Sequence, residues 1–146
     1  MKNTILLVED NEDDAFLMQR AMAEAQIVNP LQHVEDGQAA IDYLRGSGDY
    51  SDRDRFPLPM IVFLDLKLPL KNGHEVLAWI RGQPEFADLV VIVLTSSEEQ
   101  VDIKRSYQLG ANSYVVKPPT AEDLSKTAKA FNLWWLNENR VSERPC

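Results

Sequence analysis

Five short apolar runs recur along the chain, and each is followed by a segment with helical spacing. The runs are Ile5–Val8, Leu31–Val34, Met60–Leu64, Leu89–Leu94 and Tyr114–Val116. Short runs of β-branched and aliphatic residues are typical of strands that are buried on both faces. Between them apolar residues return every three or four positions, as at Ala15, Met18 and Met22. This alternation predicts an α/β domain with a doubly wound (βα)5 fold, in which helices cover both faces of a five-stranded parallel sheet.

The length of 146 residues suits one domain with its own core. We expect residues 1–140 to form this domain and residues 141–146 to form a flexible tail. One long connection, Gly46–Pro59, contains two glycines, two prolines and five charged residues. It predicts an extended, solvated loop before the third strand. The last helix is expected to be long, over about Thr120–Asn139.

Charge and cysteine content argue against several classes of protein. Fifteen Lys and Arg against 23 Asp and Glu give a formal net charge of −8, and an acidic surface repels nucleic-acid phosphates. The only cysteine is Cys146, which favours a reducing, cytoplasmic setting. No apolar stretch approaches the roughly 18 to 20 residues of a membrane helix, and no signal-peptide core is present. We therefore expect a cytoplasmic protein that binds neither nucleic acid nor membrane.

Polar side chains stand where four of the five apolar runs end. They are Glu9 and Asp10, Asp65, Thr95, and Lys117. Ligands of open α/β sheets bind beyond the carboxyl ends of the strands, and adjacent strands lie only about 4.8 Å apart, so these groups can converge. Grouped carboxylates suit Mg²⁺, a carboxylate can act as a nucleophile, and a hydroxyl and an ammonium can hold phosphate oxygens. The set therefore favours phosphoryl transfer.

Each of these residues also has an ordinary structural explanation. Glu9 and Asp10 are typical of a solvated turn or a helix cap, and Lys117 could simply end a strand. Thr95 could cap a following helix, because Ser96–Glu99 has the composition of a helix start. The functional interpretation depends on the coincidence of complementary groups at four separate strand ends, which no explanation of a single residue covers.

Together these residues resemble the receiver domain of two-component response regulators, over about residues 3 to 138. The matching elements are Glu9-Asp10, Asp65–Gly73, Thr95-Ser96 and Tyr114–Pro118. The resemblance implies a flavodoxin-like strand order with Asp65 as the phospho-acceptor. It also implies a Mg²⁺ site in which Asp10 is a direct ligand and Glu9 a ligand through water, with Asp65 and the main-chain carbonyl of Lys67 completing the protein ligands.

The same resemblance implies a switch. Thr95 and Lys117 would hold the phosphoryl oxygens, and Tyr114 would move together with Thr95. The chain departs from the usual pattern at Glu9, where Asp is commoner, at Ser96, where a small apolar residue is usual, and at Pro119, where many members have an aromatic or aliphatic residue. The resemblance thus implies a signalling module that a histidine kinase phosphorylates, not a metabolic enzyme.

A narrower similarity points to the partner. The Glu9-Asp10-Asn11 start, the Gly46–Pro59 loop and the aromatic last helix are similar to stand-alone regulators paired with bacterial and cyanobacterial phytochromes. The implied kinase is therefore a bacteriophytochrome. The cognate kinase, its signal and the downstream target do not follow from the sequence.

The last helix predicts self-association. Its core-facing stripe is Leu124, Ala128, Phe131 and Trp135. Leu133 and Leu136 lie off this stripe and Trp134 lies on its edge, which suggests a second apolar surface. We interpret Leu133, Trp134 and Leu136 as a homodimer interface, which the similarity to phytochrome-linked regulators also favours. The alternative is that they are isolated surface residues.

Three other functions could use some of these residues. A haloacid-dehalogenase phosphatase needs a second Asp two residues after its nucleophile, and Lys67 stands there. A flavodoxin needs a hydroxyl- and Gly-rich loop after the first strand, where this chain has acids that would repel a flavin phosphate. A constitutive adaptor with a receiver fold that is never phosphorylated stays open.

Overall fold

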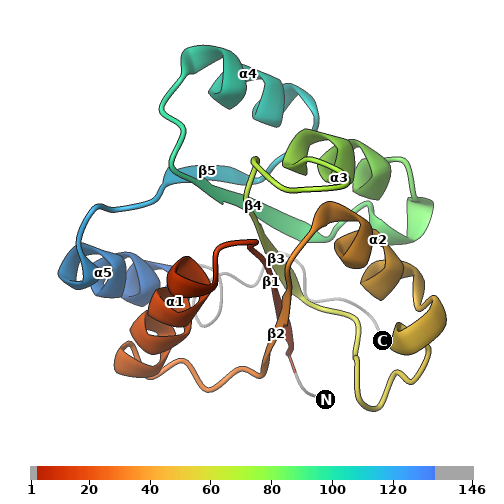
Figure 1. The fold of residues 1–146 in the computed structure, drawn as a ribbon, viewed down its shortest axis with the longest axis horizontal. Coiled ribbons are helices and arrows are strands. Elements are labelled where there is room, and N and C mark those ends of the chain that lie inside the picture. Colours follow the sequence, from red (N-terminus) through yellow and green to blue (C-terminus); the bar gives the residue numbers. More distant parts are fainter. Residues whose placement is uncertain (1–2, 134–146) are drawn as a thin grey trace.

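A five-stranded parallel sheet forms the centre of the molecule in the computed structural model, which describes residues 3–133 (Figure 1). The strands are β1 (Ile5–Val8), β2 (Leu31–Val34), β3 (Ile61–Leu64), β4 (Val90–Thr95) and β5 (Ser113–Val116). The helices are α1 (Glu12–Glu24), α2 (Gly37–Arg45), α3 (Gly73–Arg81), α4 (Gln100–Gln108) and α5 (Ala121–Phe131), with short 3-10 helices η1 (Gly48–Tyr50) and η2 (Pro84–Phe86). The strand order β2-β1-β3-β4-β5 confirms the predicted doubly wound, flavodoxin-like fold.

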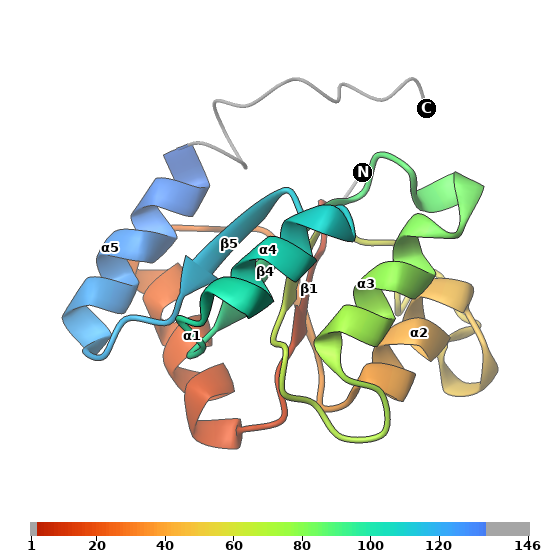
Figure 2. The ribbon, with the colours of Figure 1, turned by 90° about the horizontal axis from the view of Figure 1, so that it is seen from above.

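Side chains of each central strand point alternately into two cores. Ile5 and Leu7 of β1 pack with α1 and α5, whereas Leu6 and Val8 pack with α2 and α3. Figure 2 shows these two pairs of helices on opposite sides of the sheet. All residues of β1 and β3 are buried, as expected for strands that are covered on both faces.

Polar side chains fix the start of four helices. The caps are Asn11 for α1, Asp36 for α2, Asn72 for α3 and Thr120 for α5, and each accepts a hydrogen bond from a backbone N–H of the first turn. Helix α4 differs, because its N-cap Glu99 makes no such bond. The alternative in which Thr95 caps a helix starting within Ser96–Glu99 is wrong, since Thr95 ends β4 and α4 begins at Gln100.

The connection Gly46–Pro59 is more ordered than the predicted solvated loop. It contains η1, and the rings of Tyr50 and Phe56 pack against each other with centroids 5.2 Å apart and against Tyr43 of α2. Arg53 donates hydrogen bonds to the carbonyls of Tyr43, Leu44 and Phe56 at 2.8 to 3.1 Å. The extended loop before β3 was predicted, but these contacts were not, because the sequence does not distinguish an arginine that binds helix-end carbonyls from one in solvent.

The described part of α5 has the predicted core-facing stripe. Leu124, Ala128 and Phe131 are buried, and the Phe131 ring lies 4.8 Å from the ring of Phe63 in β3. The remaining stripe residue, Trp135, and the predicted interface residues Trp134 and Leu136 lie outside the described residues. No helix within residues 3–133 is long and apolar enough to cross a membrane.

The contacts of Arg53 lead to a stability prediction. Arg53→Ala should lower the free energy of unfolding by about 2 kcal/mol, because it leaves helix-end carbonyls without their charged donor. Arg45→Ala is the matched control, since this exposed arginine in the last turn of α2 makes no such contact with residues 3–133 and its loss should cost less than about 0.5 kcal/mol. Urea denaturation measures both values. Equal losses would show that Arg53 contributes no more than a surface charge.

Candidate functional site

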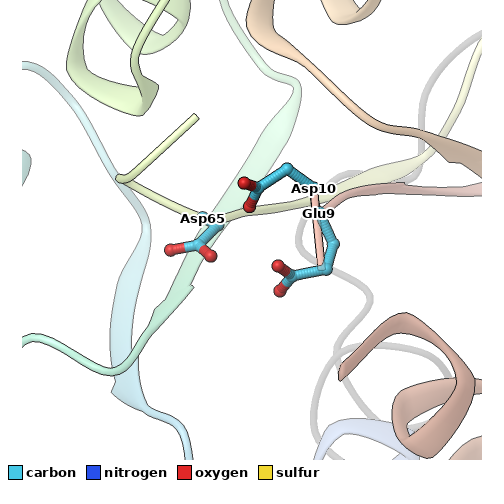
Figure 3. A group of neighbouring side chains, drawn as sticks. All are labelled: Glu9, Asp10 and Asp65. Atoms are coloured by element: carbon cyan, nitrogen blue, oxygen red, sulfur yellow. The ribbon is translucent and has the colours of Figure 1, made fainter. Parts of the chain in front are cut away.

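Three carboxylates gather at the carboxyl ends of the two central strands (Figure 3). Val8 of β1 pairs in register with Leu64 of β3, so the residues that follow them, Glu9 and Asp65, leave the sheet side by side. Ligand oxygens of Glu9, Asp10 and Asp65 all lie within 4.8 Å of one another. Glu9 and Asp65 are buried, whereas Asp10 is exposed.

The ammonium of Lys117 lies among these acids. Its Nζ is 2.5 Å from Glu9 Oε1, 3.1 Å from Asp65 Oδ2 and 3.0 Å from Asp14 Oδ2. The lysine is placed there by the sheet, because the Lys117 backbone N–H donates to the carbonyl of Thr95 at 2.7 Å as the chain leaves β5. The structure therefore brings together the residues that end β1, β3 and β5, as the sequence predicted.

Asp14 is a member of this group that the sequence analysis did not single out. It lies in the first turn of α1, where three consecutive acids are also favoured by the helix dipole, so its charge alone carried no signal. Its place in the first turn of the helix that directly follows Glu9 and Asp10 is the one sequence feature that could have identified it.

Burial and charge set the protonation of the group. Burial and, to a smaller extent, the charge of Asp65 raise the pKa of Glu9 to about 7, although the hydrogen bond from Lys117 acts to lower it. Burial alone would lower the pKa of Lys117, but its contacts with Glu9 and Asp65 raise that pKa above its usual range. The lysine is therefore firmly charged, and its hydrogen bond to Glu9 opposes the effect of burial on that carboxyl without cancelling it.

The backbone around Asp65 holds its carboxylate in one orientation. Asp65 Oδ1 accepts a hydrogen bond from the Leu66 N–H at 2.7 Å, and Oδ2 faces Lys117. Gly73, the first residue of α3, packs so closely that a Cβ there would lie 2.2 Å from the Asp65 carbonyl oxygen. The carboxylate is thus held by a main-chain N–H and the lysine, and the adjoining helix packs against the Asp65 backbone. Lys67 lies within the same turn, with its backbone N–H 3.5 Å from Asp65 Oδ1.

The two predicted switch residues are linked through a third residue. Thr95 is fully buried at the end of β4, and its Oγ1 lies 3.5 Å from the Ser97 N–H. The hydroxyl of Tyr114 donates to the Ser97 carbonyl at 2.9 Å. Thr95 and Tyr114 therefore both contact Ser97, a connection that the sequence did not indicate.

The donor set fits a divalent metal ion. Carboxylate oxygens are the ligands that hard cations prefer. Three carboxylates converge here, those of the buried Glu9 and Asp65 and that of the exposed Asp10. The buried carboxylate of Glu9 needs nearby positive charge to stay ionised, and a divalent ion would supply it.

The family to which the chain belongs follows from these features. The model of the response regulator receiver domain matches residues 5–129, and the chain is a member of that family. Members of this family bind divalent metal ions and act in signalling rather than metabolism, as the sequence resemblance implied.

Individual relatives make the similarity more specific. The chain is 40% identical over 139 residues to the probable methanogenesis regulatory protein FilR2 of Methanothrix harundinacea, covering 93% of this chain and 85% of that protein. It is 38% identical over 132 residues to response regulator Rcp1 of Synechocystis, covering 90% and 88%, and the structure of Mn²⁺-bound Rcp1 has a TM-score of 0.84.

A third relative bears on the predicted phytochrome link. The phosphorylated cyanobacterial phytochrome response regulator RcpA is 36% identical to this chain, with a TM-score of 0.86 and coverage of 94% of this chain and 96% of that one. The predicted similarity to regulators associated with phytochromes is therefore confirmed.

The close approach of Gly73 to Asp65 can be tested by stability. Gly73→Ala should lower the free energy of unfolding by about 1 to 3 kcal/mol, because the new methyl group must displace the backbone of Asp65 and Leu66. Gly82→Ala is the control, since a Cβ there makes only ordinary contacts beginning at 3.4 Å. Urea denaturation of both variants is the measurement. A Gly73→Ala protein as stable as the control would mean that the turn adjusts freely.

Proposed function

We propose that this protein is a phosphorylation switch in which Asp65 accepts a phosphoryl group from a histidine kinase. The observation that carries the proposal is the Asp65 carboxylate itself, which is buried, oriented by a backbone N–H, and 3.1 Å from the lysine ammonium. Burying a carboxylate beside other acids costs free energy of folding. The arrangement therefore favours a role that uses the charge of Asp65.

In this proposal each residue has a separate part. An Asp65 oxygen bonds to phosphorus while the phosphorus–nitrogen bond of the donor's phosphohistidine breaks. Glu9, Asp10, Asp65 and the Lys67 carbonyl would hold Mg²⁺, with Asp10 as a direct ligand and Glu9 acting through water. The ion would offset charge on the transferring group. Lys117 and Thr95 attract the phosphoryl oxygens, and Thr95 and Tyr114 pass the change to the protein surface.

The proposed donor is a bacteriophytochrome kinase. The phytochrome regulator RcpA supports this, and so does the bacteriophytochrome response regulator AtBRR, which is 39% identical with a TM-score of 0.76. FilR2 carries a name without reference to light, so phosphotransfer profiling should compare a bacteriophytochrome kinase with kinases of other signals. Preferential transfer from the phytochrome kinase is the expected result, and preference for an unrelated kinase would contradict this part of the proposal.

Labelling with a phosphorylated kinase or acetyl phosphate tests the acceptor. Asp65→Asn keeps the shape of the side chain but removes the nucleophile, so labelling should disappear. Chelation of divalent cations should also abolish labelling of the wild-type protein. Asp13→Asn is the matched control, because this exposed aspartate of α1 lies outside the carboxylate group and should label as the wild type does.

Two outcomes would contradict the proposal. Label that persists in Asp65→Asn would place the acceptor elsewhere. A wild-type protein that no donor labels in the presence of Mg²⁺, while it still binds its partners, would favour the constitutive adaptor.

We further propose that the protein forms a homodimer through its last helix. The described support is Leu133, whose surface is 60% exposed just after α5 ends. Trp134 and Leu136, the other two residues of the proposed interface, lie outside the described residues. A two-fold dimer would use this helix from both copies.

Light scattering coupled to gel filtration tests the dimer. Trp134→Ala combined with Leu133→Glu should give monomers at micromolar concentration, because truncating a large aromatic group at an interface costs about 2 kcal/mol or more. Leu58→Glu is the control, since Leu58 is 51% exposed and lies in the Gly46–Pro59 connection, which packs on α2 on the other face of the sheet from α5. A wild-type chain that runs at its monomer mass of 16.6 kDa would refute the dimer.

A further inference from the structure

Helix α4 is held differently from the other four helices. Its one buried residue is Ser106, whereas Val101 and Tyr107 are exposed large side chains. Its N-cap makes no side-chain hydrogen bond. A helix with so little apolar burial gains little from packing, so a few hydrogen bonds decide where it lies.

One of these bonds joins α4 to the loop after β4. The Ser97 hydroxyl donates to Asp102 Oδ2 at 2.6 Å, and the same hydroxyl oxygen accepts from the Glu99 N–H at 3.3 Å. A short bond to a carboxylate is stronger than one between neutral groups. Asp102 therefore fixes the position of Ser97.

Ser97 is also the residue that both proposed switch residues contact. Its carbonyl accepts the hydrogen bond of Tyr114, and its N–H faces Thr95 Oγ1 at 3.5 Å. All three polar groups of Ser97 are thus engaged, two by the switch residues and one by α4. Displacement of Ser97 would change the surroundings of Thr95 and of Tyr114 at the same time.

One helical turn further along, on the same face as Asp102, α4 is tied to α3. The Ser106 hydroxyl donates to the Asp102 carbonyl at 2.8 Å, so its oxygen accepts from His74 Nε2, which lies 3.0 Å away. His74 directly follows Gly73, which packs against the Asp65 carbonyl. A continuous path of contacts therefore runs from the Asp65 backbone through α3 and α4 to the loop that carries Ser97.

We propose that Asp102 is a positioning residue for phosphoryl acceptance. It lies outside the carboxylate group and acts through Ser97, which it holds where Thr95 can meet the incoming phosphoryl oxygens and Tyr114 can follow. This inference rests on the proposed function of Asp65. It adds the requirement that α4 hold the loop after β4 in place, which no residue of the carboxylate group does.

The rate of labelling by acetyl phosphate at saturating Mg²⁺ tests the inference. Asp102→Ala and Ser97→Ala should each slow labelling roughly tenfold, the effect of losing one hydrogen bond to a charged group. The double variant should be no slower than either single variant, because both remove the same bond. Asp102→Asn keeps an acceptor for the Ser97 hydroxyl and should label within about twofold of the wild type.

Glu98→Ala is the matched control. It removes one negative charge from the same loop at an exposed residue with no hydrogen bond or ion pair in the described part of the chain, and it should leave the rate unchanged. Circular dichroism establishes that each variant is folded. If Asp102→Ala does not fold, Ser97→Ala carries the test, since it leaves the charge of α4 intact.

The results separate this inference from the proposed function. A wild-type protein that is not labelled refutes the role of Asp65. Normal labelling of the wild type together with unchanged rates in folded Asp102→Ala and Ser97→Ala overturns the inference alone. A further measure is Tyr114→Phe: its effect on the rate should shrink when Asp102→Ala is also present, and strictly additive effects would show that Asp102 and Tyr114 act independently.

Discussion

The charge on Lys117 is what allows several carboxylates to stand together at the carboxyl end of this sheet. The ammonium lies within 3.1 Å of Glu9, Asp14 and Asp65, two of which are buried. Burial favours the protonated form of a carboxyl, and it raises the pKa of Glu9 even though Lys117 acts to lower it. The same ammonium is suited to attract a phosphoryl group, so one side chain serves both the stability of the site and its proposed chemistry.

The rest of the fold divides into a rigid part and a weakly packed part. The central strands and α1, α2, α3 and α5 share two apolar cores, which fix the ends of β1 and β3 relative to each other. Helix α4 contributes little to either core and is held by hydrogen bonds at Asp102 and Ser106. This division suits a switch, because the acceptor needs fixed geometry and the responding surface needs an element that can move at small cost in free energy.

Sequence reasoning was most successful where burial dictates the pattern. The five predicted apolar runs coincide with the five strands to within one residue at each end. The cause is clearest in β1 and β3, because a strand covered on both faces must be apolar throughout. Prediction failed for polar side chains whose partners lie far away in the sequence, and for those in segments of ordinary composition. Arg53 was assigned to a solvated loop although it satisfies the carbonyls at the end of α2, and Asp14 was one acid among three.

The sequence by itself determined the alternation of strands and helices and the polar residues that end four of the strands. Only the tertiary structure decided which of those residues meet. Register places Glu9 beside Asp65, and the lysine reaches three acids, which follow β1, follow β3 and lie in α1. Ser97 joins Thr95, Tyr114 and Asp102 through bonds no local pattern encodes. The physical reason is that the type of each residue indicates whether it is buried. Hydrogen bonds and ion pairs instead depend on distances that are set only when separate elements pack together.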